Sequence, residues 1–258
     1  MATLYESPEM AAGYAAARPP IHREILAKAR PHLERLGLAV PARRALDVGC
    51  GAGLSTRALG SLAQECLGID PSPAMVRCAT SVVPEGRFQV GRAESLPLAA
   101  ASIDLITAAG SLNYADLDRF FPEAVRALAP GGALVVYDFG QGRASHQIPG
   151  LEPWFQGFLQ RYPMPSDDWR ELSPEALGNR DPRLPLAASE RFEIGVPLTL
   201  ERYTDYLLTE SNVAEALARG AVASELRCLV FRELEPLFGG NSIEVLFPGY
   251  LAVLGPVR

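Results

Sequence analysis

The sequence predicts an α/β protein whose core is an open, doubly wound parallel sheet. From residue 44 to residue 140, short apolar segments alternate with helical patterns, which is typical of repeated strand–helix–strand units. The first and fifth of these segments, Arg44–Val48 and Ala133–Tyr137, are nearly continuous apolar runs. Strands of that kind belong to a sheet that helices cover on both faces.

The elements of this central part follow one another at short intervals. The expected strands are Arg44–Val48, Glu65–Ile69, Arg87–Val90, Ile103–Ala108 and Ala133–Tyr137. The expected helices are Leu54–Gln64, Ser72–Ser81 and Ala115–Leu128. Before the fourth strand, Ala99, Ala100 and Ala101 leave room for a short helix at most.

The flanking segments differ in composition. Residues 8–18 and Ile21–Leu36 read as helices, the second with a stripe of apolar side chains along one side. Residues 141–190 are rich in proline and hold both tryptophans, so we expect a cap over the sheet edge. Beyond them we expect a strand at Phe192–Pro197, helices at Leu200–Arg219 and Ala223–Phe238, and one or two strands within Ile243–Leu254.

The whole chain, 1–258, is expected to form a single domain. Its parts are the N-terminal helices 1–37, a core 40–140, the cap 141–190, and the C-terminal strands and helices 191–258. At this length one large core is sufficient. We expect a monomer or a homodimer.

Charge and composition limit the classes of partner that we expect for this protein. The net charge is −6, with 30 acidic and 24 basic side chains, so neither nucleic acid nor a membrane is expected as a partner. The four cysteines form no Cys-x-x-Cys pair and the three histidines are scattered, so no metal is expected. With no secretory signal and no run of 18 apolar residues, we expect a cytoplasmic protein with reduced thiols.

A glycine-rich turn follows the first strand. Asp47 precedes Gly49, Gly51 and Gly53 at alternate positions, and the second strand ends at Asp70. Glycines allow close backbone approach to a ligand, and an acid at the next strand tip can accept hydrogen bonds from ribose hydroxyls. A dinucleotide fingerprint would place its third glycine at position 54, where this chain has leucine. The spacing therefore favours a nucleoside cofactor without phosphates over NAD.

Five segments, in order and spacing, resemble the motifs of class I S-adenosylmethionine (SAM)-dependent methyltransferases. They are Leu46–Gly53, Gly68–Met75, Gly91–Leu98, Asp104–Ala108 and Arg126–Gly132. Residues 14–19, Tyr-x-x-x-Arg-Pro, and a segment at 197–211 resemble the small-molecule subgroup of type 11 and trans-aconitate-like methyltransferases. The resemblance implies a Rossmann-like, seven-stranded sheet, mostly parallel with the last strand antiparallel, under a helical or irregular cap. It also implies N-terminal helices 1–37 that cover the SAM site.

The resemblance implies roles for individual residues around SAM. Asp70 would bind the ribose hydroxyls, and Arg18 the SAM carboxylate. Asp47 would organise the turn or face the SAM amino group through water. Where the family often has aspartate, this chain has Arg92, which cannot accept a hydrogen bond, so Glu94 or a backbone carbonyl would receive the adenine amino group. The expected cofactor-binding set is Tyr14, Arg18, Asp47, Gly49, Cys50, Gly51, Asp70, Pro71, Met75, Ala93, Glu94 and Ala109.

The expected reaction is in-line methyl transfer to a small-molecule substrate, yielding S-adenosylhomocysteine. O-methylation of a carboxylate or hydroxyl is favoured. N- or C-methylation of a secondary metabolite and a non-catalytic, protein-binding SAM-fold subunit are the alternatives. Asn113 and Tyr114, after the fourth strand, are expected to orient the acceptor, and His146 is the candidate base. For several residues a non-functional explanation is the alternative. His146 would then be exposed to solvent, and Met75 and Tyr14 would pack in the core.

Overall fold

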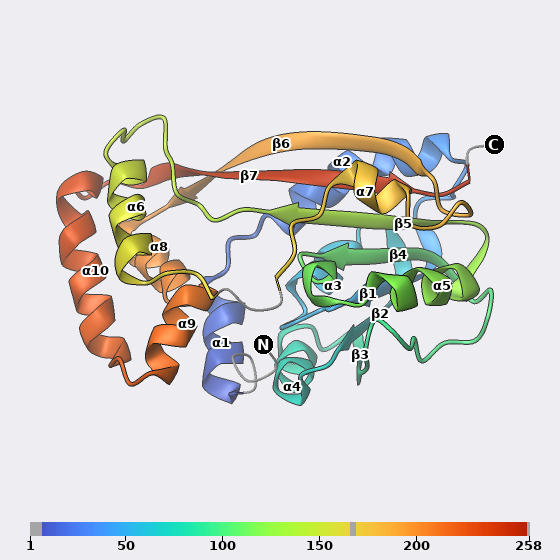
Figure 1. The fold of residues 1–258 in the computed structure, drawn as a ribbon, viewed down its shortest axis with the longest axis horizontal. Coiled ribbons are helices and arrows are strands. Elements are labelled where there is room, and N and C mark those ends of the chain that lie inside the picture. The colour runs from blue at the N-terminus through green and yellow to red at the C-terminus, as the bar shows by residue number, and fades with distance from the viewer. Residues whose placement is uncertain (1–6, 166–168, 257–258) are drawn as a thin grey trace.

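The computed structural model describes residues 7–165 and 169–256, and these form a seven-stranded sheet with helices on both faces (Figure 1). The strands are β1 (Ala42–Val48), β2 (Ala63–Asp70), β3 (Arg87–Val90), β4 (Ile103–Ala109), β5 (Leu128–Phe139), β6 (Leu186–Leu198) and β7 (Ile243–Leu254). Their order across the sheet is β3-β2-β1-β4-β5-β7-β6. The strand β7 runs antiparallel to both its neighbours, and the other pairings are parallel. The predicted fold class is confirmed.

The order in which strands are added to the sheet reverses at β1: β2 and β3 lie on one side of it, and β4 and the later strands lie on the other. This strand pairs with β2 on one side and with β4 on the other. In open α/β sheets a ligand crevice forms at such a switch point, outside the carboxyl ends of the strands. The glycine turn that follows Val48 lies at this edge.

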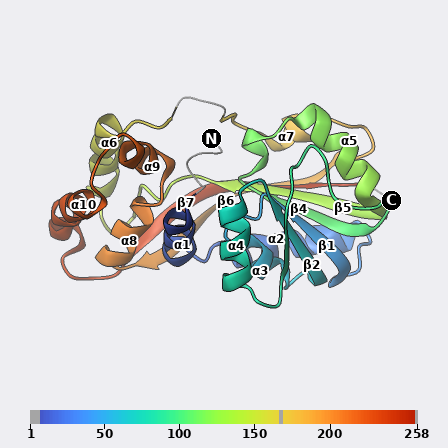
Figure 2. The same cartoon turned by 90° about the horizontal axis from the view of Figure 1, so that it is seen from below.

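Helices cover the two faces of the sheet unequally (Figure 2). The described helices are α1 (Pro8–Ala17), α2 (His22–Arg35), α3 (Leu54–Leu59), α4 (Pro73–Val82), α5 (Leu117–Ala127), α6 (Leu151–Arg161), α7 (Pro174–Gly178), α8 (Leu200–Leu207), α9 (Ser211–Ala218) and α10 (Ala223–Phe238), with a 3₁₀ turn at Leu112–Tyr114. One hydrophobic core joins α2 and α3 to one face, and another joins α5 and α7 to the opposite face.

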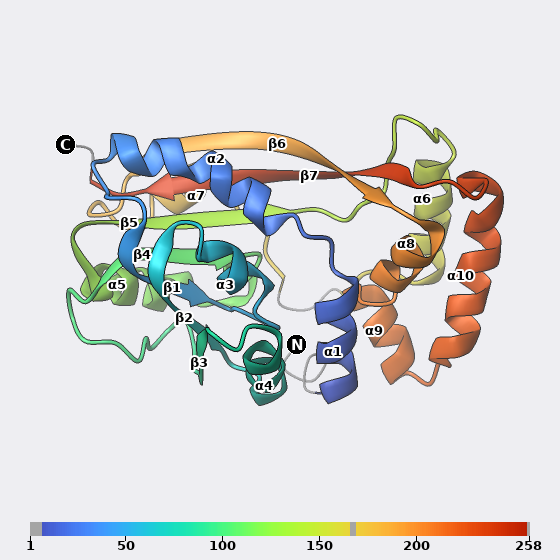
Figure 3. The same ribbon diagram turned by 180° about the vertical axis from the view of Figure 1, so that it is seen from behind.

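Four helices, α6, α8, α9 and α10, gather beyond the sheet where β6 and β7 extend past the other strands (Figures 1 and 3). We call these four helices the helical lobe. The indole of Trp154 on α6 donates to Glu233 on α10 at 3.0 Å, and Arg161 pairs with the same carboxylate. Helix α1 lies between the helical lobe and α4, and it contacts both α4 and α8.

The structure departs from the expected elements in three places. The helix expected over Leu54–Gln64 ends at Leu59, because Gly60 caps it and β2 already begins at Ala63. The helix expected over Leu200–Arg219 is divided after Leu207, where the Thr209 hydroxyl donates to the carbonyl of Tyr206 at 2.7 Å. The expected cap, 141–190, contributes α6 to the helical lobe, whereas α7 packs against β6 and β7.

The remaining elements lie where expected, but β5 (Leu128–Phe139) and β6 (Leu186–Leu198) are longer than the expected Ala133–Tyr137 and Phe192–Pro197. Residues 91–102, all of them described, contain no helix. The final segment forms a single strand rather than two. Within the described ranges, no helix is both long and apolar enough to cross a membrane.

Candidate cofactor and acceptor site

Asp47, the last acid before the glycine turn, is fully buried. Its Oδ2 accepts hydrogen bonds from the hydroxyls of Ser55 and Thr56, both at 2.6 Å, and its Oδ1 accepts one from Thr107 at 3.0 Å. Burial raises the pKa of Asp47, and the three hydroxyl donors oppose that rise. The carboxyl therefore ties the start of α3 to β4, and its predicted role at the SAM site stays a prediction.

The three glycines of the turn all have positive φ, but each meets different surroundings. A Cβ on Gly49 would lie 2.2 Å from the Cβ of Ser111, and one on Gly53 would lie 3.1 Å from that of Ala79. A Cβ on Gly51 would meet nothing within 4 Å. Packing thus excludes side chains at Gly49 and Gly53, whereas at Gly51 the backbone faces open space. Only there is the turn open to a ligand.

Asp70, at the tip of β2, is joined to the same turn. Its Oδ2 accepts the N–H of Gly51 at 3.0 Å, and its Oδ1 accepts the N–H of Ser72 at 2.8 Å. Burial raises the pKa of Asp70, while these two N–H donors act in the opposite direction. Each carboxylate oxygen keeps a further lone pair, so the group can still accept bonds from hydroxyls of a ligand.

The other residues predicted around the cofactor lie at or after the carboxyl ends of β1 to β4, with Met75 on α4. Met75 is buried in a small cluster with Ala11 of α1 and Ala52 of the turn. Pro71 is exposed, Ala93 and Ala109 are partly buried, and Cys50 is buried. Burial raises the pKa of the Cys50 thiol far above its usual range, so this cysteine is not a nucleophile at neutral pH.

Glu94 is held in place by backbone. Its Oε1 accepts the N–H of Asp116 at 3.0 Å, and its Oε2 lies 3.5 Å from Nε of Arg92, whose side chain is largely exposed. Burial works to raise the pKa of Glu94, but the N–H of Asp116 and the arginine charge outweigh it, and the pKa is lowered. An ionised carboxylate at this position suits the predicted acceptor role toward an amino group.

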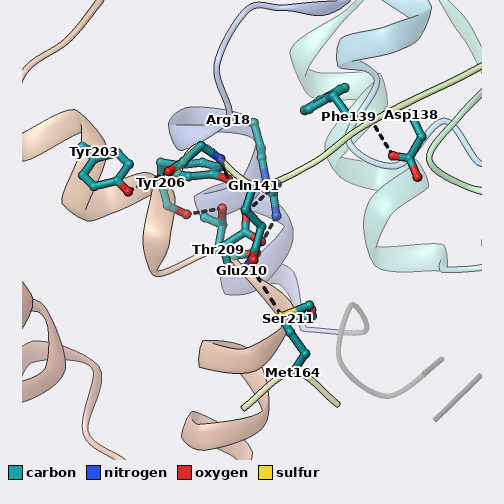
Figure 4. A network of polar contacts seen from close by, with 11 residues as sticks. Arg18, Asp138, Phe139, Gln141, Met164, Tyr203, Tyr206, Thr209, Glu210 and Ser211 are labelled. Atoms are coloured by element: carbon teal, nitrogen blue, oxygen red, sulfur yellow. Dashed lines mark hydrogen bonds and ion pairs between the residues drawn. The ribbon is translucent and has the colours of Figure 1, made fainter. Parts of the chain in front are cut away.

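Arg18, at the end of α1, contacts the helical lobe. Its Nη1 lies 2.8 Å from Oε1 of Glu210, and its Nη2 donates to the carbonyl of Thr209 at 2.9 Å. Gln141 donates to the other oxygen of Glu210 at 2.7 Å, so the three side chains point toward one another (Figure 4). The guanidinium also stacks over Tyr14, with its carbon 4.5 Å from the ring centre. The predicted pairing of Arg18 with the SAM carboxylate stays a prediction; in the structure its partner is Glu210.

A second polar group lies on the sheet side, at the ends of β4 and β5. Asn113 is buried and donates to Oδ2 of Asp138 at 3.1 Å and to the carbonyl of Arg170 at 3.0 Å. The N–H of Phe139 donates to Oδ1 of Asp138 at 2.8 Å. Burial raises the pKa of Asp138 to about 6, against the effect of these two donors.

Tyr114 connects the two polar groups. Burial raises its pKa to about 12, and the charges of Asp138 and Glu210 add to the rise while Arg18 opposes it. The phenol is therefore within electrostatic reach of carboxylates on the sheet side and on the lobe side. We use the term acceptor crevice for the group formed by Tyr114, Asp138 and Glu210, which lie at the ends of β4 and β5 and at the start of α9.

His146, the predicted base, is not brought to the acceptor crevice. The carbonyl of Ala144 accepts the N–H of Leu246, and Ser145 is buried, so the chain turns His146 outward. Its side chain is 79% exposed, with Nε2 3.7 Å from Glu193 on the edge strand β6. The solvated alternative describes this residue, and the prediction of a base at His146 is corrected.

Four polar residues at the crevice or beside it were missed from the sequence: His22, Asp138, Gln141 and Glu210. A signal existed for Asp138, because it follows the apolar run of β5 as Asp70 follows that of β2. His22 pairs its Nδ1 with the Tyr137 hydroxyl at 3.0 Å, and burial, followed by the charge of Arg18, lowers its pKa to about 4. In the described part of the chain, no three His, Cys, Asp or Glu side chains are grouped to hold a metal.

The comparison with known proteins matches the part of the chain that holds the glycine turn and Asp70. Residues 46–136 match the family model described as a methyltransferase domain. The chain is 32% identical over 127 residues to the chloroplastic tocopherol O-methyltransferase of Arabidopsis thaliana. It is 38% identical over 110 residues to the malonyl-acyl-carrier-protein O-methyltransferase of Methylococcus capsulatus. These alignments take in 46% and 40% of this chain but only 36% and 40% of the two relatives.

A solved structure extends the likeness over most of the fold. A proposed type II methyltransferase from Anaeromyxobacter dehalogenans is 26% identical, with a TM-score of 0.63, over 88% of this chain and 96% of that one. A strand-order switch point, a glycine turn and an acid at the tip of the next strand are features of nucleoside-binding α/β proteins. Residues 46–136 thus belong to the methyltransferase-domain family, and the fold as a whole resembles that of a methyltransferase.

Proposed function

We propose that this protein transfers a methyl group from SAM to an oxygen atom of a small-molecule acceptor. The observation that carries the proposal is the pairing of Gly51 with Asp70. The turn is open to a ligand at Gly51, and the N–H of that glycine already positions the Asp70 carboxylate. A ribose needs an acceptor with free lone pairs beside a backbone it can approach closely, and both are present.

The residues at and after the carboxyl ends of β2 and β3 would hold SAM by three kinds of contact. Asp70 accepts the ribose hydroxyls, the Glu94 carboxylate accepts the adenine amino group, and Met75 packs against the ring. When bound, SAM supplies a methyl group on a sulfonium that is already activated for displacement. The protein then needs chiefly to align the acceptor and exclude water, and alignment alone can lower a barrier by up to roughly 7–11 kcal/mol.

The acceptor would enter between the sheet and the helical lobe, beside Asn113 and Tyr114. Both relatives above are named as O-methyltransferases, which supports an oxygen acceptor. Their aligned parts correspond to well under half of each relative, so they support no particular acceptor molecule. The net charge of −6 agrees with a small molecule rather than nucleic acid.

Calorimetry with SAM and with S-adenosylhomocysteine tests the cofactor half of the proposal. Asp70→Ala should weaken both affinities by 10- to 100-fold, because a charge-assisted hydrogen bond is worth about 1.5–3 kcal/mol. Gly51→Val should abolish binding, because the side chain fills the only open position of the turn. Asp118→Asn is the matched control, since that carboxylate lies on the outer surface of α5 and pairs with Arg180.

The two results that count against the proposal are distinct. An unchanged SAM affinity in Asp70→Ala would contradict the ribose role. A wild-type protein that binds neither nucleoside would instead point to the protein-binding, non-catalytic subunit.

A further inference from the structure

The acceptor crevice carries more negative than positive charge. Glu210 is balanced by Arg18, whose guanidinium is 2.8 Å away, whereas Asp138 has two neutral donors, Asn113 and the Phe139 N–H, and no ion pair among the described residues. Arg170 lies near Asn113, but its guanidinium donates to the carbonyl of Ala115. An anionic acceptor brought to Asp138 would therefore meet an uncompensated like charge.

The cross-strand neighbour of Asp138 offers a second polar contact. Tyr250 on β7 pairs directly with Asp138 on β5, and residues opposite each other in an antiparallel pair share one face of the sheet. The Tyr250 hydroxyl is buried and has no hydrogen-bond partner among the described residues. Buried hydroxyls are rarely left without one, and a hydroxyl can both donate and accept. A ligand group that donates to Asp138 can also accept from this phenol.

Large apolar side chains are exposed on the segments that contact Asn113 and Gln141. Tyr114, Met164 and Trp169 are 40%, 47% and 50% exposed. Met164 is in contact with Gln141 on the lobe side, and Trp169 precedes Arg170, whose N–H donates to the carbonyl of Asn113. Exposed apolar side chains grouped around a polar centre mark a binding site for a molecule with an apolar body.

Building on the proposed function, we infer that the acceptor is an uncharged hydroxyl compound with an apolar body, and that Asp138 binds its hydroxyl and takes its proton. The acceptor oxygen forms a bond to the methyl carbon as the sulfur–carbon bond breaks, and that electron pair stays on sulfur. The O–H electron pair stays on oxygen, and the proton passes to a carboxylate oxygen of Asp138. Of the two oxygen acceptors favoured by the sequence, this selects the hydroxyl over the carboxylate.

The raised pKa of Asp138 agrees with this role. At about 6, the carboxyl is still mainly ionised at neutral pH, yet it is a stronger base than an ordinary aspartate. The transferred proton is then released to water from the half-buried crevice.

The test compares two probes with the same body, 4-methylphenol and 4-methylbenzoate, binding to protein saturated with S-adenosylhomocysteine. The phenol should bind about 10-fold or more tightly than the benzoate, because only the phenol donates to Asp138. Asp138→Asn should remove that preference, while Asp118→Asn should keep it. Methyl transfer to the phenol should fall with Asp138→Asn and leave the affinity for SAM within about threefold of wild type.

Tyr250→Phe provides a second variant that removes only one oxygen atom. It should weaken phenol binding by about fivefold, the value of one hydrogen bond. The inference is overturned if the benzoate binds as tightly as the phenol, if the preference survives in Asp138→Asn, or if neither probe binds at millimolar concentration. Saturation with S-adenosylhomocysteine is measured first, so its failure counts against the proposed function and not against Asp138.

Discussion

The turn around Asp47 and the contacts around Glu210 are both buried and polar, but they are assembled over different distances along the chain. Two of the three hydroxyls on Asp47 come from residues 8 and 9 positions later. Arg18 reaches the Thr209 carbonyl and Glu210 across about 190 positions. The first arrangement depends mainly on one strand–turn–helix unit, to which β4 adds Thr107. The second depends on the helical lobe docking correctly on α1.

Replacing Asp47 should have the largest effect, because it removes the centre of the local arrangement. Asp47→Ala leaves three hydroxyl donors without their acceptor and should lower the free energy of unfolding by about 4 kcal/mol. Urea unfolding measures the change. Asp47→Asn, which keeps one acceptor oxygen, should lose about half as much. Equal stability of wild type and Asp47→Ala would mean that the turn does not depend on this carboxyl.

Glu210→Gln tests the distant arrangement. It removes the carboxylate that lies 2.8 Å from Nη1 of Arg18, whose side chain is 14% exposed, and should cost about 3 kcal/mol in stability. Arg18→Met combined with Glu210→Met should cost less than the sum of the two single changes, since the double variant leaves no buried charge. Strict additivity would contradict a direct pairing.

Arg18 is also where the two regions meet. If it binds the cofactor carboxylate, as its resemblance implies, Arg18→Met lowers SAM affinity about 10-fold. If it serves the lobe alone, stability falls and SAM affinity does not. Calorimetry on the single variant separates these two roles.

The pH dependence of stability should show the smallest of these effects, because two groups oppose each other. The folded-state pKa of His22 is lowered from 6.5 to about 4. His22 therefore makes its full contribution to the free energy of unfolding above pH 6.5, and this contribution is lost as the pH falls from 6.5 to about 4. The pKa of Asp138 is raised from 3.8 to about 6, so its contribution is present at low pH and is lost as the pH rises. His22→Gln removes the first slope, so the stability of the variant relative to wild type should decline by about 2 kcal/mol between about pH 4 and pH 6.

Urea unfolding across this pH range measures the slope. His146→Gln, at an exposed histidine, is the matched control and should follow wild type. If the stability of His22→Gln relative to wild type stays constant or rises over this pH range, the assigned contribution of His22 is contradicted.

The same contrast explains what the sequence could predict. The strands of the core and the acids at their tips, Asp47 and Asp70, were predicted because apolar runs and short spacings are visible along the chain. The break at Thr209 was not, because the division between α8 and α9 depends on one side-chain bond to the Tyr206 carbonyl and on lobe packing. His146 seemed close to the site because it follows β5, but the bridge between Ala144 and Leu246 turns it toward solvent.

The long pair β6 and β7 has a mechanical consequence. The helices α8, α9 and α10 connect the end of β6, at Leu198, to the start of β7, at Ile243, with only a few residues at each junction. The two strands are paired along their whole length and extend from the sheet into the helical lobe. The lobe is thus joined to the core by a stiff ribbon rather than by a linker. If an acceptor binds between the sheet and the lobe as proposed, a bulkier one would have to bend this ribbon, so the backbone would help to select acceptors by size.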